Sequence, residues 1–408
     1  MTRNLHNSDY SPVVVLGLCP TGLAVVRSLG REGIPVFGVD SSYYAISLFS
    51  RYCKKLVILN PRKDEEKLVK CLVKFALTVK HKPVLFATSD DFLIFIANNN
   101  NELSRYFIYP SINNEIADKF LDKEQFYKIC NDVQIDYPKV YCPANMEDLR
   151  AISSIVRYPC IIKPIRTHEW AKTFKVKKAF KINSKEEMMQ TMLKIQGTAL
   201  EKNILIQELV EGPDNKIYFF AAYFDNKSNP LGYCTGRKIR QFPPEFGTTA
   251  SAESLYVPEI IDKSINLLQR IEYHGLCDVE FKYDDKDHKF KIIEINPRPG
   301  RWYGLVEGAK VNLISRAYFD LTGLKMGQID VQIDGLKWIF VWRDIISAFY
   351  YLRLKQLTFR NYFRSLKGKK IYAIYASDDA LPFFVFPFTL FVEIINVSLK
   401  KVFKNLSK

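Results

Sequence analysis

Four polar residues sit at regular intervals on two neighbouring apolar segments late in the chain. Glu280 lies within CDVEFKY (277–283), and Glu294, Asn296 and Arg298 occupy alternate positions of IIEINPR. Side chains two residues apart on a strand share a face, so the last three project to one side. Carboxylate and amide oxygens suit Mg²⁺, and Arg298 would hold an anion formed beside the metal. The spacing therefore predicts a magnesium site that works on phosphate.

The alternative is a solvated strand face, because charged residues are mostly exposed. The apolar neighbours in IIEIN and the acid across the turn favour a half-buried sheet that lines a cleft.

Three lysines are candidates for phosphate contact. Lys163 lies inside the apolar run CIIKP, where an ammonium group is costly without a negative partner. Lys123 begins the helical pattern LDKEQF, and Lys178 follows the basic segment WAKTFKVKK. Glu208, after the strand-like LIQ, would accept from an adenine amino group or a ribose. For each of these residues a plain surface position is the alternative.

The elements that position these residues form an α/β chain with several cores. Its 408 residues, of which 48% are apolar, are enough for two or three hydrophobic cores. A strand over Val13–Leu16, a helix opening at Gly22, and strands in IPVFGVD and PVLFATSDD predict a parallel sheet flanked by helices. A second domain begins near Tyr109, and its segments CDVEFKY and KFKIIEIN predict a hairpin across the turn DDKDH.

At this point the chain resembles the ATP-grasp superfamily. The motifs that carry the resemblance, in the family's order and spacing, are DK at 122–123, IIKP at 161–164, QELVEG at 207–212, VEF at 279–281 and IEINPRPG at 293–300. The resemblance covers about residues 111–323. It implies a Rossmann-like (pre-ATP-grasp) domain over 1–110 and an ATP-grasp α+β domain over 111–325, with a small subdomain over about 111–200 and a large one over about 201–325. A basic, aromatic C-terminal extension over 326–408 follows.

The resemblance also implies roles for the residues that match its motifs. Lys123 and Lys163, with Lys178, would contact ATP phosphates. Glu208, Leu209 and Val210 would hold the adenosine. Glu280, Glu294 and Asn296 would bind two Mg²⁺ ions, with Mn²⁺ as an alternative metal. Arg298 would stabilise an acyl-phosphate or its attack product. Lys238 and its companion Arg240 would touch the γ-phosphate or a carboxylate, unless they belong to a plain basic strand.

One segment departs from the family pattern. Many relatives carry a glycine-rich flap over the phosphates, whereas the residues between Pro164 and Lys178 include no glycine. This segment is similar to the basic, Trp-containing loop of uncharacterised carboxylate-amine ligases associated with cell-surface polysaccharides. There, His168 and Trp170 would contact substrate or simply pack.

The N-terminal GLCPTG is neither G-x-G-x-x-G nor a Walker A motif. Asp40 stands where a dinucleotide fold places its ribose-binding acid. We favour a domain that helps to hold the non-nucleotide substrate, with Asp90 and the loop at Gly17 as candidates. Structural turn residues are the alternative.

The net charge of +15 is concentrated in the C-terminal extension. Residues 331–408 hold 13 Lys/Arg and five Asp/Glu, or +8 of the total. From Phe391 to Leu406 an apolar stripe at helical spacing predicts a basic amphipathic helix at a membrane surface, or one docked on the protein or a twin subunit. Two prolines, Glu393 and Asn396 argue against a membrane span.

Eight scattered cysteines predict reduced thiols, and residues 1–12 lack the apolar core of a signal peptide, so we expect a cytoplasmic protein, peripheral on the inner face of the membrane. The expected activity is a Mg-dependent carboxylate-amine ligase that forms an amide through an acyl-phosphate, on a cell-envelope or polysaccharide precursor. A non-catalytic, membrane-associated nucleotide-binding protein is the alternative. We expect small-molecule acid and amine substrates, a homo-oligomer and no nucleic acid, because the aromatic residues of the extension run in apolar blocks.

Overall fold

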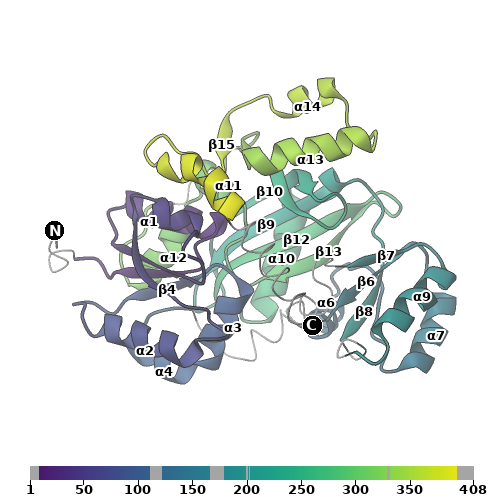
Figure 1. Ribbon diagram of the computed structural model, residues 1–408, viewed down its shortest axis with the longest axis horizontal. Coiled ribbons are helices and arrows are strands. Elements are labelled where there is room, and N and C mark those ends of the chain that lie inside the picture. Colours follow the sequence, from purple (N-terminus) through teal and green to yellow (C-terminus); the bar gives the residue numbers. More distant parts are fainter. Residues whose placement is uncertain are drawn as a thin grey trace.

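The computed structural model describes residues 9–110, 122–165, 179–198, 201, 203–328 and 331–392. The chain begins with a four-stranded parallel sheet in the order β3-β2-β1-β4. This sheet belongs to the purple N-terminal part of the molecule in Figure 1, where β4 is labelled. Its strands are β1 (Val13–Leu16), β2 (Val36–Asp40), β3 (Cys53–Ile58) and β4 (Val84–Ala87), and its helices are α1 (Pro20–Arg31), α2 (Glu65–Ala76), α3 (Asp90–Asn98) and α4 (Asn100–Tyr106). A 3-10 helix, η1, covers Ile46–Phe49.

Both faces of this sheet are covered, which explains why all four residues of β1 are buried. Val14 and Leu16 join the core beneath α2, α3 and α4. Val13 and Val15 face the opposite way, into a core shared with α1 and with helices from much later in the chain. The predicted parallel α/β unit is confirmed.

A small antiparallel sheet follows, in the order β5-β8-β6-β7. Its strands are β5 (Val140–Tyr141), β6 (Cys160–Pro164), β7 (Phe180–Ile182) and β8 (Ile204–Glu208), accompanied by α6 (Lys123–Asp132), α7 (Met146–Ile155) and α9 (Lys185–Ile195). α7 and α9 cover the face formed by Cys160, Ile162 and Ile206. Because β8 pairs with β6, this sheet extends past residue 200, where we expected the small subdomain to end.

A seven-stranded sheet, in the order β13-β12-β9-β10-β11-β14-β15, forms the centre of the molecule. Its strands are β9 (Ile217–Phe224), β10 (Pro230–Phe242), β11 (Thr248–Ser254), β12 (Gly275–Asp284), β13 (Lys289–Asn296), β14 (Lys337–Ile339) and β15 (Lys370–Tyr372). Alternate residues of β9 enter two cores, one with α11 (Tyr303–Gly308) and α12 (Leu313–Leu321), the other with α6 and α10 (Pro258–Arg270). A 3-10 helix, η2 (Asp214–Lys216), precedes β9. The predicted hairpin of β12 and β13 is confirmed, with Glu280 opposite Glu294.

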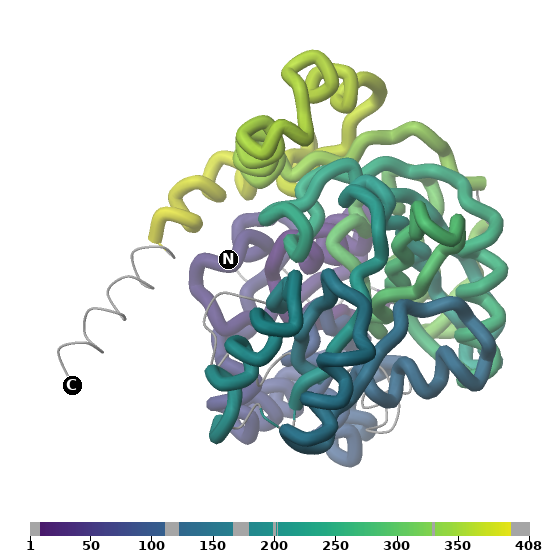
Figure 2. Tube along the Cα trace, turned by 90° about the vertical axis from the view of Figure 1, so that its right-hand side faces the viewer, coloured from purple at the N-terminus to yellow at the C-terminus, as the bar shows by residue number. Residues whose placement is uncertain are grey.

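The C-terminal extension is built into this sheet. β14 pairs with β11, and β15 pairs in parallel with β14. Three helical segments lie along one side of the molecule (Figures 1 and 2): α13 (Val341–Arg353), α14 (Phe359–Ser365) and helical residues 381–392. Of the predicted stripe, residues 393–408 lie outside the described part of the chain. Among the described helices, none combines the length and the hydropathy that a membrane span requires.

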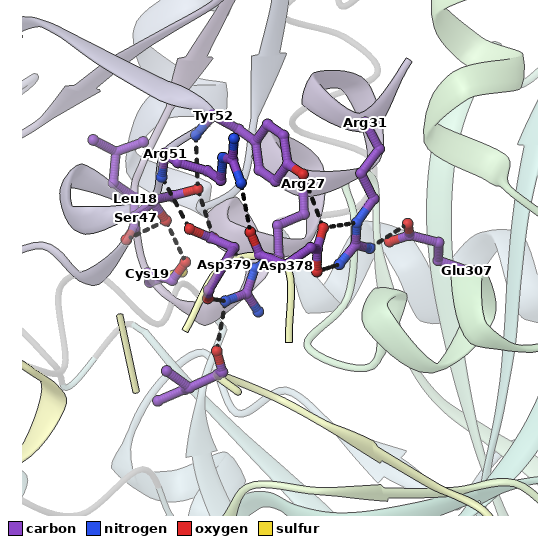
Figure 3. A network of polar contacts seen from close by, with 12 residues as sticks. Leu18, Cys19, Arg27, Arg31, Ser47, Arg51, Tyr52, Glu307, Asp378 and Asp379 are labelled. Atoms are coloured by element: carbon purple, nitrogen blue, oxygen red, sulfur yellow. Dashed lines mark hydrogen bonds and ion pairs between the residues drawn. The ribbon is translucent and has the colours of Figure 1, made fainter. Parts of the chain in front are cut away.

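An acidic pair at residues 378–379 ties the extension to the N-terminal domain (Figure 3). Asp379 is buried and accepts from Arg27 Nε at 2.9 Å and from Ser50 Oγ at 2.7 Å. Asp378, nearer the surface, pairs with Arg31, which also contacts Glu307. Hydrogen bonds with Arg31 hold the pKa of Asp378 well below its ordinary value. The extension and the first domain thus form one body.

Candidate active site

A cleft of about 590 Å³ opens where the N-terminal sheet, the small sheet and the seven-stranded sheet meet. Nine of the predicted site residues line it: Lys123, Lys163, Leu209, Val210, Lys238, Glu280, Glu294, Asn296 and Arg298. From the N-terminal domain, Cys19, Thr21, Thr88, Ser89 and Asp90 line the same space. Residues from three sheets therefore converge on one cavity, which is large enough for a nucleotide and a small acid.

Oxygen donors face one another across the β12–β13 hairpin. Glu280 lies opposite Glu294, and Asp278 lies opposite Asn296. The Glu294 carboxylate is exposed to the cleft and has no hydrogen bond or ion pair from a described residue. The described residues include no group of three or more His, Cys, Asp or Glu side chains able to hold a metal alone. The donor set nevertheless fits Mg²⁺, which binds through one or two carboxylates and completes its shell with phosphates and water.

A lysine neutralises one of these acids. Lys238 Nζ lies 2.8 Å from Glu280 Oε2 and 5.5 Å from the centre of the Trp302 ring, and both side chains of the ion pair are largely buried. The ammonium group therefore lies among the acidic oxygens of the β12–β13 hairpin, at the polar side of the cleft.

Two further residues of β12 were missed. Asp278 and Lys282 flank Glu280 at alternate positions and line the cleft with it. Asp278 accepts from Trp302 Nε1 at 2.8 Å, and burial together with Glu280 raises the pKa of Asp278. Burial lowers the pKa of Lys282. The period of two that placed Glu294, Asn296 and Arg298 would also have identified this pair.

Lys163 and Lys123 meet at the side of the cleft near the small sheet. Lys163 Nζ lies 3.2 Å from the hydroxyl of Tyr127. Burial and the neighbouring charge of Lys123 lower the pKa of Lys163 to about 7, against a partial opposing effect of Glu294. The charged form of Lys163 is disfavoured in this half-buried position, and a phosphate oxygen would favour it, so this end of the cleft is suited to phosphate.

Arg298 spans the cleft. Its Nε donates to Asp90 Oδ1 at 2.6 Å and its Nη2 to Asn296 Oδ1 at 3.0 Å. Burial alone would lower the pKa of Arg298, but Asp90 and Glu294 more than compensate, so the pKa is raised. The guanidinium is thus fixed beside the acid pair of the hairpin.

The structure does not bring Arg240 to the cleft. Arg240 forms a two-pronged ion pair with Asp344 of α13 at 2.9 Å, with both side chains buried, and donates to Ser365. The pairing of β10 with β11 is irregular on both sides of Arg240, a bulge that turns Gln241 toward the cleft instead. Gln241 Nε2 is buried and has no partner among described residues. The expected pairing of Arg240 with Lys238 in the site is therefore corrected, because the bulge shifts the alternation by one residue.

The adenosine candidates divide between two cavities. Leu209 and Val210 line the cleft, but they also line a smaller cavity of about 170 Å³ that contains Glu208. Glu208 accepts weakly from the hydroxyl of Tyr141 at 3.4 Å. Its neighbour Gln207 points into the cleft instead. Lys178, His168 and Trp170 lie outside the described residues.

The N-terminal loop places a helix end in the cleft. Gly17 has a φ of +95°, and a Cβ on Gly22 would lie 2.2 Å from the Gly17 carbonyl oxygen, so only glycine permits this turn. Asp40 accepts from the backbone of Leu18 at 2.6 Å and fixes the loop. Asp40 thus has a structural role here, where a dinucleotide fold would use it on ribose.

Arg301 faces the N-terminus of α1 across this end of the cleft. Its guanidinium makes no hydrogen bond or ion pair with a described residue, and burial lowers its pKa. An arginine without a counter-charge next to a helix N-terminus is a ready site for a carboxylate. No sequence period points to Arg301, which follows the PRPG turn.

Comparison with known proteins agrees with this geometry. Residues 122–310 match the family described as Carbamoyl-phosphate synthase L chain, ATP binding domain. The chain is 27% identical over 314 residues to a D-aspartate ligase of Enterococcus faecium (strain Aus0004), covering 74% of each chain. It is 22% identical over 224 residues to the carbamoyl phosphate synthase large chain of Thermoanaerobacter pseudethanolicus (strain ATCC 33223 / 39E), and spans only 20% of that protein.

Two solved structures share the fold. One is N5-carboxyaminoimidazole synthetase from Staphylococcus aureus complexed with ADP, with a TM-score of 0.61, 12% identity, and coverage of 80% of this chain and 82% of that one. The other is L-amino acid ligase from Bacillus licheniformis, with a TM-score of 0.60, 14% identity, and coverage of 79% and 78%.

Proposed function

We propose that the chain is an ATP-grasp ligase of the carboxylate-amine type, which joins a small acid to an amine at the expense of ATP; the match of residues 122–310 to an ATP-binding domain and the similarity to a D-aspartate ligase support this. The observation that carries the proposal is the convergence of paired acids, clustered lysines and Arg298 on one cleft.

In the proposed reaction a carboxylate oxygen of the acid attacks the γ-phosphorus of ATP, and the bond to the β-phosphate oxygen breaks. The products of this step are ADP and an acyl-phosphate. The amine then attacks the acyl carbon, a C–N bond replaces the C–O bond, and phosphate and a proton leave. Such phosphoryl transfer needs positioning and neutralised charge rather than a protein nucleophile.

The residues of the cleft divide this work. Lys163 and Lys123 hold phosphate oxygens, and Leu209 and Val210 lie beside the nucleoside. Glu280, Glu294 and Asn296 are the residues that would hold Mg²⁺, which supplies charge neutralisation to the phosphates. Lys238 lies close enough to Glu280 to meet the γ-phosphate, and Arg298 meets the charge that develops at the acyl centre.

The acid has a separate place at the N-terminal end of the cleft. Arg301 and the N-terminus of α1 would bind a carboxylate that does not react, so the substrate class is an acid with a second anionic or polar group, such as an amino acid. The similarity to a D-aspartate ligase supports an amino diacid. A cell-envelope or polysaccharide precursor as the amine remains part of the proposal, as does a cytoplasmic location at the membrane surface.

The test is phosphate release from MgATP over a panel of amino acids and sugar acids, each offered with an amine. We expect release with a restricted set of acids. Glu294→Gln removes one metal-facing charge and is expected to lower release by at least about a hundredfold, with an unchanged melting temperature. Turnover of this variant at the wild-type rate would refute the metal assignment. Nucleotide binding without release for any acid would favour the non-catalytic alternative.

A further inference from the structure

The described part of the C-terminal extension leaves several large apolar side chains more than a third exposed. α13 buries Asp344, Ser347, Ala348 and Tyr351. Its opposite side exposes Trp342, Ile345, Ile346, Phe349 and Tyr350. In α14, Phe359 and Phe363 are 70% and 65% exposed. A helix that buries one face and leaves an apolar one in water marks an interaction site.

Helical residues 381–392 repeat this arrangement. Phe383 and Phe386 pack against the core shared with the N-terminal domain. Leu381, Phe384, Phe388 and Phe391 are 56%, 69%, 62% and 60% exposed, and their spacing of three and four residues places them on one stripe. Figures 1 and 2 both show this helix on the side of the molecule that carries α13 and α14. We call the exposed apolar side chains of these three helices the apolar face.

Unpaired cations accompany the apolar face. Residues 353–370 contain seven basic side chains and no acidic one. All seven are exposed, and none forms an ion pair with a described residue: Arg353, Lys355, Arg360, Arg364, Lys367, Lys369 and Lys370. Some exposed bases elsewhere on the protein, such as Arg31, Arg62 and Lys289, have acidic partners. The excess charge is therefore concentrated beside the apolar face.

We infer that the apolar face and these seven cations dock on an anionic membrane surface. Apolar and aromatic side chains enter the headgroup region of a bilayer, while lysine and arginine meet lipid phosphates. The exposed aromatic side chains of residues 381–392 have no basic residue among them, whereas a nucleic-acid surface interleaves stacking rings with cations, which disfavours nucleic acid. A second copy carries the same charge of +15 and would bring cations against cations. The inference extends the sequence prediction, which placed membrane contact beyond Phe391, and does not depend on the ligase reaction.

The buried side of α13 is hydrogen-bonded to the end of β10, which lines the cleft. Ser347 Oγ donates to the carbonyl of Gln241 at 2.8 Å, and Arg343 donates to that of Phe242 at 3.3 Å. Gln241 and Thr248 both line the cleft. One helix, about 10 Å across, thus separates the membrane-facing surface from the active site. A substrate held in the membrane surface would meet the cleft from this side.

Vesicle flotation with the full chain tests the inference. The probes are vesicles of phosphatidylcholine alone and vesicles with about a third phosphatidylglycerol. The wild-type chain is expected to bind only the anionic vesicles and to dissociate at high salt. The variant F384S/F388S should bind at least about tenfold more weakly, and R360Q/R364Q/K367Q about a hundredfold more weakly. All these side chains are exposed, so the melting temperature should not change.

Matched variants lie on the N-terminal domain and small sheet. L77S/L193S removes two apolar side chains that are 71% and 67% exposed, and K67Q/K70Q/K74Q removes three exposed lysines of α2. Both should bind vesicles like the wild type. Absence of wild-type binding to anionic vesicles, or binding unaffected by both extension variants, would overturn the inference. So would binding of an oligonucleotide instead of vesicles, or a dimer that F384S/F388S dissociates without vesicle binding. Phosphate release without lipid is measured in parallel, so a failure here is distinguishable from a failure of the ligase proposal.

Discussion

The guanidinium of Arg298 donates a 2.6 Å hydrogen bond to the carboxylate of Asp90, from the end of β13 to the start of α3. The two residues are 208 positions apart in the chain. Their ion pair links the seven-stranded sheet to the N-terminal domain across the cleft. It also aims the second arm of the guanidinium at Asn296, so the arginine is fixed before any substrate binds.

Arg298→Lys keeps the charge but loses this two-sided geometry, since an ammonium is a point donor. We expect kcat to fall by about a hundredfold while the Kd for ADP changes little. Asp90→Asn should give a smaller loss in the same direction, because Arg298 loses its counter-charge. Asp285→Asn is the matched control, because Asp285 forms an exposed ion pair with Lys216 and does not line the cleft. A loss of ADP affinity equal to the loss of kcat would place Arg298 on the nucleotide.

The lowered pKa of Lys163 predicts that nucleotide binding depends on pH. Its pKa is lowered to about 7 from 10.5 in the free protein. The unfolded chain therefore binds more protons between these pH values, and the contribution of Lys163 to stability rises with pH across that window. Phosphate favours the charged form, so nucleotide binding reverses the shift, takes up a proton above pH 7, and weakens as the pH rises.

Titration calorimetry of ADP at about pH 8, in buffers of different ionisation enthalpy, measures this uptake. The wild type should take up close to one proton, and Lys163→Met should take up none. Equal uptake by both proteins would assign the proton to another group.

The alternation of side chains along a strand was sufficient to predict many of the residues that line the cleft. The hairpin of β12 and β13, its paired acids and Arg298 follow from a period of two, and Lys163 follows from the cost of an ammonium group in an apolar strand. These are local patterns. The same rule fails at Arg240, because the bulge in β10 depends on pairing with β11, a strand for which the sequence offered no clear signal.

The long-range contacts could not be predicted from the sequence, for a related reason. β14 and β15 are three residues each, too short for a period, and exist because β11 offers an edge. Asp344 looked like one of a few acids in a basic tail, yet it is buried against Arg240. Arg301 stands in an irregular turn, where only the fold shows that α1 lies opposite.

Arg301 should bind the acid and not the nucleotide. Arg301→Ala removes a charge-assisted contact with the carboxylate that does not react, and we expect the KM for the acid to rise by about 10- to 100-fold with a small change in kcat. Arg301→Lys should restore part of the affinity. The KM for ATP serves as the internal control. A rise in the KM for ATP with no change for the acid would exclude this carboxylate site.

The buried pair of Arg27 and Asp379 predicts how firmly the extension is attached. Asp379→Ala leaves Arg27 buried without a counter-charge and removes the acceptor for Ser50, so we expect a loss of about 3 kcal/mol in the free energy of unfolding. Asp378→Asn, at the half-exposed pair with Arg31, should cost at most about 1 kcal/mol. The double variant R27A/D379A should recover part of the loss, because no isolated charge remains. Urea unfolding of the four proteins checks this order, and equal losses for Asp378→Asn and Asp379→Ala would show that burial does not set the strength of the attachment.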